Sequence, residues 1–171
     1  ISLYGTNEEQ YSQTVRKKNQ FDLVKNNIVN LINHKNKNNL NTLVGLNYIL
    51  LDGRGEDMLK ILEFIKSVNK LVGNKKNNIN FLTLREDFRS TTNLRLKKDE
   101  RIKLVNFFRK FQQELNNNKE FENLFVDYGY SLEPIKDGYV DHIYEDVFAD
   151  ENILLKEGTP NISVAIDLYG D

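Results

Sequence analysis

The spacing of apolar residues changes repeatedly along this chain between a strand pattern and a helix pattern. Residues 43–51 form a nearly continuous apolar run, which is typical of a strand buried on both faces. Shorter β-prone runs bounded by turn residues occur elsewhere. Together these runs predict strands over residues 1–4, 43–51, 79–84, 124–128 and 162–168.

Between the strands, apolar residues recur at the three- and four-residue spacing of amphipathic helices. The three sets are Phe21, Val24, Ile28, Leu31 and Ile32; Met58, Ile61, Leu62, Ile65, Val68 and Val72; and Ile102, Val105, Phe108, Phe111 and Leu115. Glu8, Glu9 and Gln10 suit the first turn of a further short helix. Alternation of strands and helices predicts an α/β fold with mostly parallel strands joined by crossover helices.

The chain of 171 residues is long enough for one domain with its own core. Residues 1–130 carry the alternating pattern, and residues 131–171 are expected to be a loop-rich C-terminal extension that ends in a final strand. Because the chain opens in mid-strand, we expect it to be a piece of a longer protein.

Composition narrows the possible functions. The net charge is -1, so no basic footprint for nucleic acid is present. No apolar run reaches the roughly 20 residues needed to span a bilayer, and no secretory signal opens the chain. We therefore expect a cytoplasmic protein without nucleic-acid or membrane partners. The chain has no cysteine, and its two histidines are isolated, so no metal site is predicted.

Candidate functional residues lie where the predicted strands end, because ligands of parallel α/β folds bind at the carboxyl ends of the strands. These residues should converge on a single cavity. They are Ser2, Tyr4 and Gly5; Asp52, Gly53, Arg54 and Gly55; Arg85, Glu86 and Asp87; and Asp127, Tyr128 and Tyr130.

Each group also has a structural interpretation. The segment from Arg85 to Asp87 could clamp a polar ligand through its guanidinium, or it could pair with the following helix. Residues 52–55 read more simply as a strand-to-helix turn. The carboxylate of Asp127 and the phenols of Tyr128 and Tyr130 suit sugar hydroxyls, although tyrosines are equally common in cores.

Read in order, these segments resemble the radical S-adenosylmethionine (SAM) family. Residues 2–11 are similar to the fourth strand and helix of that family's barrel. Residues 48–54, 85–87, 126–130 and 164–171 are similar to a subgroup that deaminates TDP-linked amino-dideoxyglucose in desosamine biosynthesis. The resemblance spans essentially the whole chain, and the order of the segments is more specific than any one of them.

The resemblance implies the C-terminal half of a partial (β/α)6 barrel, a TIM-barrel relative. It implies a lyase that uses S-adenosyl-L-methionine and a [4Fe-4S] cluster, an external electron donor and a nucleotide-sugar substrate. The implied cofactor-binding residues are Ser2, Tyr4, Asn47 and Ile49. The implied catalytic residues are Arg85, Glu86 and Asp87, and the implied substrate-binding residues are Arg54, Asp127, Tyr128 and Tyr130.

The chain departs from the family in two places. It lacks the three cysteines that hold the iron–sulfur cluster, so we expect this segment alone to be inactive. The turn after residue 51 lacks the proline that the subgroup carries before its glycine. Two alternatives stay open: a radical SAM dehydrogenase of a hydroxylated sugar or cyclitol, and a non-catalytic domain of a degenerate relative.

Overall fold

In the computed structural model, residues 1–73, 78–87 and 96–140 are described, and residues 1–140 form one compact unit. The final strand predicted at 162–168, with most of the C-terminal extension, lies outside the described residues.

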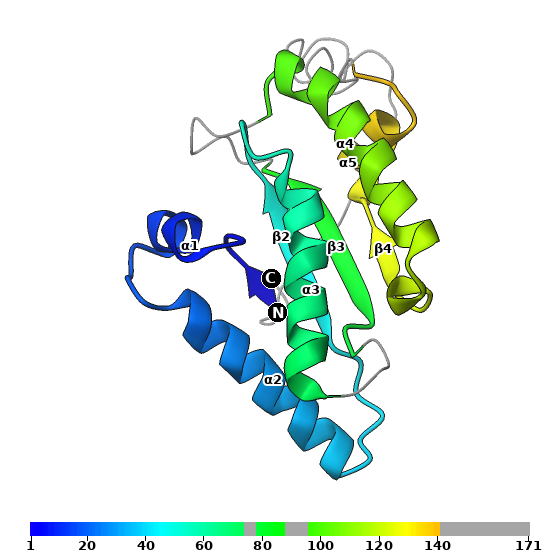
Figure 1. Ribbon diagram of the computed structural model, residues 1–171. Coiled ribbons are helices and arrows are strands. Elements are labelled where there is room, and N and C mark those ends of the chain that lie inside the picture. Colours follow the sequence, from blue (N-terminus) through cyan, green and yellow to red (C-terminus); the bar gives the residue numbers. More distant parts are fainter. Residues whose placement is uncertain (74–77, 88–95, 141–171) are drawn as a thin grey trace, which may run out of the picture. The chain divides into compact units, whose positions relative to one another are not determined.

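The centre of this unit is a sheet of four parallel strands whose spatial order equals their order in the chain (Figure 1). The strands are β1 (Ser2–Leu3), β2 (Gly45–Leu50), β3 (Phe81–Glu86) and β4 (Phe125–Asp127). The predicted mixed α/β fold with parallel strands is therefore confirmed. β3 continues two residues further than predicted, so Arg85 and Glu86 belong to the strand itself.

The helices are α1 (Glu8–Val15), α2 (Phe21–Lys37), α3 (Asp57–Val72), α4 (Lys98–Asn117) and α5 (Gly129–Lys136), with a short 3-10 turn, η1 (Lys119–Phe121). The first four follow the predicted pattern. α3 ends where Gly73 adopts φ 72°, a left-handed conformation that glycine accepts readily.

Two predictions about helices are wrong in detail. Part of the stretch expected to be loop-rich forms α5, although Pro134 lies inside it. Leu132 and Ile135 lie three residues apart and are both buried, so core packing stabilises this helix against its proline. In α4, Ile102 is exposed, because the inward stripe instead contains Arg101, Leu104, Phe108 and Phe111.

The crossover connections decide which face of the sheet is covered. Such connections are right-handed in nearly all proteins, so strands added in one direction place every crossover helix on the same face. Figure 1 shows α3 along this face, and α3 packs against both α2 and α4. Leu3, Tyr48 and Leu84 lie side by side in register on the covered face and are buried. The core is therefore one sheet face and the apolar sides of the helices.

Candidate functional site

The sheet face opposite the helices carries a row of polar side chains, which we call the polar row. It consists of Ser2, Asn47, Thr83 and Asp127, which are paired in register across the four strands. Because side chains alternate along a strand, residues in register point to the same face. Each strand thus contributes one hydroxyl, amide or carboxylate group to a single line across the sheet.

The residues two positions away in each strand define the surroundings of the polar row. Toward the amino ends of the strands lie Gly45, Phe81 and Phe125, which are also in register. Toward the carboxyl ends lie Ile49 and Arg85, paired with each other. Ile49 is 41% exposed and Phe125 is 68% exposed, so the described helices leave these two positions of the face open.

Asn47 has an unusual environment within the polar row. Its side-chain Oδ1 is buried but accepts no hydrogen bond from the part of the chain that the structure describes. A buried acceptor without a donor costs about 1–3 kcal/mol, so such atoms often mark the place of a ligand or of ordered water.

The turn after β4 lies beside both Asp127 and Arg85. Asp127 accepts a hydrogen bond from the Gly129 amide at Oδ1, over 2.9 Å. Gly129 has φ 58°, and a side chain there would come within 4.0 Å of Arg85 Cγ. The stem of the Arg85 side chain therefore lies beside the turn after β4, and the strand register puts Arg85 on the same sheet face as Asp127.

Glu86 points the other way. It is in the buried layer between the sheet and α4, and its Oε1 pairs with Arg101 Nη2 at 2.9 Å. Of the two interpretations of this segment, the structure supports the ion pair with the following helix for Glu86. Asp87 lies one residue beyond β3 and is partly buried.

The three tyrosines predicted at the site have different surroundings. Tyr128 packs edge-on against Phe108 and Phe111 of α4, and burial raises the pKa of its phenol to about 12. It therefore belongs to the core side of the sheet. Tyr4 follows β1, is 44% exposed and contacts the ring of Tyr11. Tyr130 lies in α5, and its side chain falls outside the described part.

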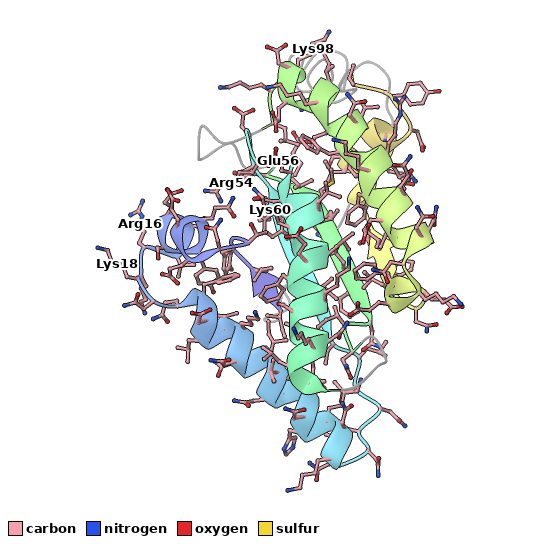
Figure 2. The ribbon with its side chains drawn as sticks, viewed as in Figure 1. Arg16, Lys18, Arg54, Glu56, Lys60 and Lys98 are labelled. Atoms are coloured by element: carbon pink, nitrogen blue, oxygen red, sulfur yellow. The ribbon has the colours of Figure 1, made fainter. Side chains whose placement is uncertain are left out.

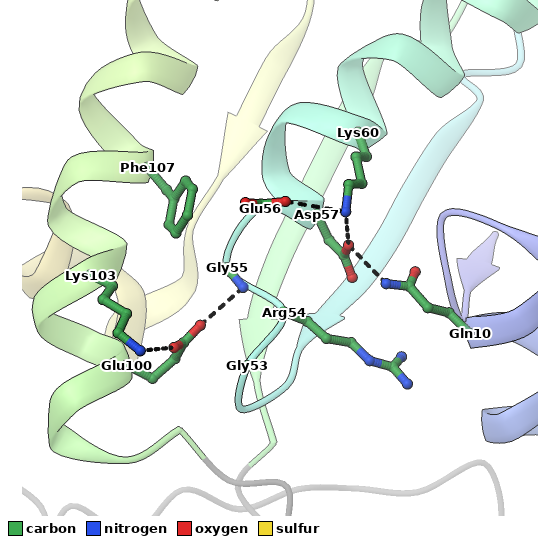
Figure 3. A pocket seen from close by; sticks show the side chains of 10 residues that line it. All are labelled: Gln10, Gly53, Arg54, Gly55, Glu56, Asp57, Lys60, Glu100, Lys103 and Phe107. Atoms are coloured by element: carbon green, nitrogen blue, oxygen red, sulfur yellow. Dashed lines mark hydrogen bonds and ion pairs between the residues drawn. The ribbon is translucent and has the colours of Figure 1, made fainter.

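Arg54 lies beside a second feature, a cavity of about 250 Å³ on the helix side of the strand ends (Figure 3). Its Nη2 donates to Gln13 of α1 over 3.1 Å, whereas Nη1 is buried with no acceptor among the described residues. Figure 2 shows Arg54, Glu56 and Lys60 gathered near the start of α3. The structure therefore does not join Arg54 to the polar row through any described contact.

The turn before α3 is fastened to α4. The Gly55 amide donates to Glu100 Oε1 over 3.1 Å, and Lys97 Nζ lies 3.1 Å from Asp52 Oδ2. These contacts agree with the interpretation of residues 52–55 as a strand-to-helix turn.

Asp57 forms a buried hydrogen-bonded cluster beside this cavity. Its carboxylate accepts from Tyr48 at 2.5 Å, from Gln10 at 3.0 Å and from Thr6 at 3.3 Å. Burial, together with the bond to Asp57, raises the pKa of the Tyr48 phenol far above its ordinary value. The cluster joins β2, α3 and the turn after β1, and so fixes the carboxyl end of the sheet.

Sequence reasoning missed two residues of these sites. Thr83 shares a face with Arg85 because it lies two residues earlier in the same strand, and this signal was available from the sequence. Asp57 gave no such signal, because an acidic residue in the first turn of a helix is ordinarily exposed.

Within the described residues, no group of three or more metal-ligating side chains comes together. The helices of the described ranges are each too short or too polar to cross a bilayer.

The fold places the chain in the class of α/β proteins with a parallel sheet, and one face of that sheet carries the polar row. No protein-family model matches the chain. Among curated proteins, it is 29% identical over 177 residues to the dTDP-4-amino-4,6-dideoxy-D-glucose ammonia-lyase of Streptomyces venezuelae. The alignment covers 99% of this chain but 34% of that protein, so the chain spans about a third of its relative.

Proposed function

We propose that this chain is part of a radical SAM enzyme that eliminates ammonia from a nucleotide-linked amino-deoxysugar. The relative's name supports the reaction and the substrate class. The observation that carries the proposal is the face shared by Ser2, Asn47, Ile49, Arg85 and Asp127, because residues expected to bind cofactor and residues expected to bind substrate lie on one surface.

This shared surface also supports the proposed barrel. In a closed (β/α) barrel the helices lie outside, and the opposite face of the sheet lines the interior. The polar row would then face the barrel interior, and the aromatic pair Phe81 and Phe125 would fill its amino-terminal end. The four parallel strands are consistent with part of such a barrel.

The residues of this face fit S-adenosyl-L-methionine but not the cluster. Ser2 and Asn47 offer a hydroxyl and a buried amide oxygen in need of a donor, and Tyr4 and Ile49 add apolar surface toward the carboxyl edge. When bound, S-adenosylmethionine supplies the radical chemistry that removes a hydrogen atom from the sugar. An iron–sulfur cluster needs thiolates, and this chain has no cysteine to offer.

The chain's own residues would bind and orient the substrate. The guanidinium of Arg85 is exposed at the mouth of the sheet, where it would hold an anionic group of the nucleotide sugar. Asp127 would accept a hydrogen bond from a sugar hydroxyl. Arg54 lines the cavity on the helix side of the strand ends. It would bind a phosphate of the substrate only if that phosphate reached this cavity. The proposal also includes an external electron donor as a partner of the enzyme.

The reaction is tested with the protein that carries this chain, reconstituted with iron and sulfide and supplied with S-adenosylmethionine, a chemical reductant and dTDP-4-amino-4,6-dideoxy-D-glucose. Released ammonia supports elimination. An oxidised sugar that keeps its nitrogen supports the dehydrogenase instead, and recovery of unchanged substrate from a reconstituted protein contradicts both.

The role of Arg85 is tested by Arg85→Gln. Loss of a guanidinium contact to an anionic substrate should raise KM for the nucleotide sugar about tenfold or more, since charge-assisted bonds contribute about 1.5–3 kcal/mol. Arg109→Gln, an exposed substitution on α4, is the matched control and should leave KM unchanged. An Arg85→Gln enzyme with the parent's KM would contradict the assignment.

A further inference from the structure

Thr83 has no role in the function described so far, although it occupies the middle of the polar row. It is in register with Asn47 on one side and with Asp127 on the other. Neighbouring strands lie about 4.8 Å apart, so its hydroxyl comes between an amide and a carboxylate on the same face. Thr83 is partly buried.

We propose that Thr83 and Asp127 together bind the vicinal diol of a sugar ring laid across β3 and β4. This inference rests on the proposed function for the identity of the sugar, but its geometry comes from the strand register alone.

The chemistry of the two side chains selects a diol. A carboxylate only accepts hydrogen bonds, whereas a threonine hydroxyl both donates and accepts. Asp127 already accepts from Gly129 at Oδ1, and Oδ2 has no partner among the described residues. One ligand hydroxyl can therefore donate to Asp127, and its neighbour can accept from or donate to Thr83. A phosphate lacks donors at neutral pH and would be repelled by the carboxylate.

The surface beside the pair suits a sugar ring. Phe81 lies two residues before Thr83, and its ring covers Gly45, where an added Cβ would lie 2.2 Å from it. Phe81 and Phe125 thus form an apolar surface next to Thr83 and Asp127, on the side of the amino ends of the strands. A ring that hydrogen-bonds Thr83 and Asp127 would rest its C–H groups on these aromatic rings.

Two ligands of the proposed reaction carry a vicinal diol: the amino-deoxyhexose of the substrate and the ribose of S-adenosylmethionine. The deoxyribose of a dTDP sugar carries no such pair of hydroxyls. The binding experiment therefore treats the two ligands separately.

The test uses the protein that carries this chain, without reductant, so that no turnover occurs. Dissociation constants for S-adenosylmethionine and for the dTDP-amino-sugar are measured by calorimetry for the parent, Thr83→Val, Thr83→Ser and Thr42→Val. Valine keeps the shape and strand preference of threonine but removes the hydroxyl. Thr42 is exposed just before β2 and serves as the matched control.

Thr83→Val should weaken the binding of one of the two ligands about five- to tenfold, as expected for one lost hydrogen bond. Thr83→Ser and Thr42→Val should both bind within about twofold of the parent, because each variant keeps a hydroxyl at position 83. The affected ligand identifies the source of the diol. A deoxy analogue of that ligand that lacks the hydroxyl assigned to Thr83 should bind the parent more weakly but bind Thr83→Val no more weakly than the complete ligand does.

Three results would overturn the inference: Thr83→Val binds both ligands like the parent, Thr83→Ser loses as much as Thr83→Val, or the parent binds neither ligand. The outcome is separable from the proposed reaction. A Thr83→Val defect in a protein that releases no ammonia supports the diol site and rejects the lyase, whereas ammonia release with unchanged binding rejects the diol site alone.

Discussion

At the residue scale, Asp57 shows how a buried carboxylate can organise the carboxyl end of a sheet. It is 1% exposed and accepts hydrogen bonds from Tyr48, Gln10 and Thr6, which come from three separate elements or turns. Its position at the start of α3 also places a negative charge near the positive end of that helix.

Asp57→Asn should therefore destabilise the protein by about 2 kcal/mol or more, because an amide replaces one acceptor with a donor that faces other donors. The free energy of unfolding from chemical denaturation measures this change. Glu56→Gln is the matched control, since the Glu56 side chain is 66% exposed, and it should stay within about 0.5 kcal/mol of the parent. Equal effects of the two substitutions would contradict the role of the cluster.

The sequence identified the strand ends better than it identified the direction of individual side chains. Ser2, Asn47, Arg85 and Asp127 were expected at the site and do share a face. Glu86 was expected beside Arg85 but points into the core, because adjacent residues of a strand face opposite sides. Alternation would have placed Arg85 and Glu86 on opposite faces only if the predicted strand had extended through residue 86. The prediction ended the strand at residue 84 because charged residues follow it.

At the element scale, Glu8 links α1 to α2. Its carboxylate accepts from the backbone amides of Asn19, over 2.6 Å, and of Phe21, over 2.9 Å, and also from Ser12. Phe21 is the first residue of α2, and Gln20 before it provides no side-chain cap. A residue of one helix thus caps the next, which stabilises amides that would otherwise lack acceptors.

These hydrogen bonds, first that from Ser12 and then that from Phe21, hold the pKa of Glu8 below its ordinary value of 4.5. A lowered pKa means that the stabilisation is present above pH 4.5 and is lost as the pH falls through the lower, folded-state pKa. Glu8→Gln should remove this acid dependence and speed amide exchange at Asn19 and Phe21 at neutral pH.

Hydrogen exchange resolved by residue and recorded at several pH values measures the effect. Glu9→Gln changes the neighbouring, exposed carboxylate and should leave exchange at the start of α2 unaltered. If Glu8→Gln exchanged like the parent at every pH, the carboxylate would not be the cap of α2.

The elements themselves were predicted to different degrees. Long periodic segments such as α3 agree with the sequence, because their apolar stripe is set by packing against a single sheet face. α5 was missed since Pro134 is ordinarily a signal against a helix interior. Ile102 was predicted to face inward because its spacing fits the apolar stripe, but Arg101 is the buried residue at this point of the helix. A buried arginine is not expected from the sequence unless its partner, here Glu86, is also known.

At the scale of the compact unit formed by residues 1–140, the sheet has one face packed against helices and one face that carries the polar row. The packed face depends on α4 staying in place over β3. The Arg101–Glu86 pair joins these two elements where both side chains are at most 2% exposed. Because Glu86 directly follows Arg85, this pair also sets the position of the backbone that presents Arg85 to the opposite face.

Removing one member of such a pair leaves a charge in a dry environment, which typically costs about 3–5 kcal/mol. Arg101→Leu and Glu86→Leu should each destabilise the protein by about this amount, as measured by chemical denaturation. The double variant should be clearly more stable than the sum of the single changes predicts, since it leaves neither charge behind. Arg109→Leu, on the exposed side of α4, is the control. Strictly additive single effects would mean that the two side chains do not stabilise each other.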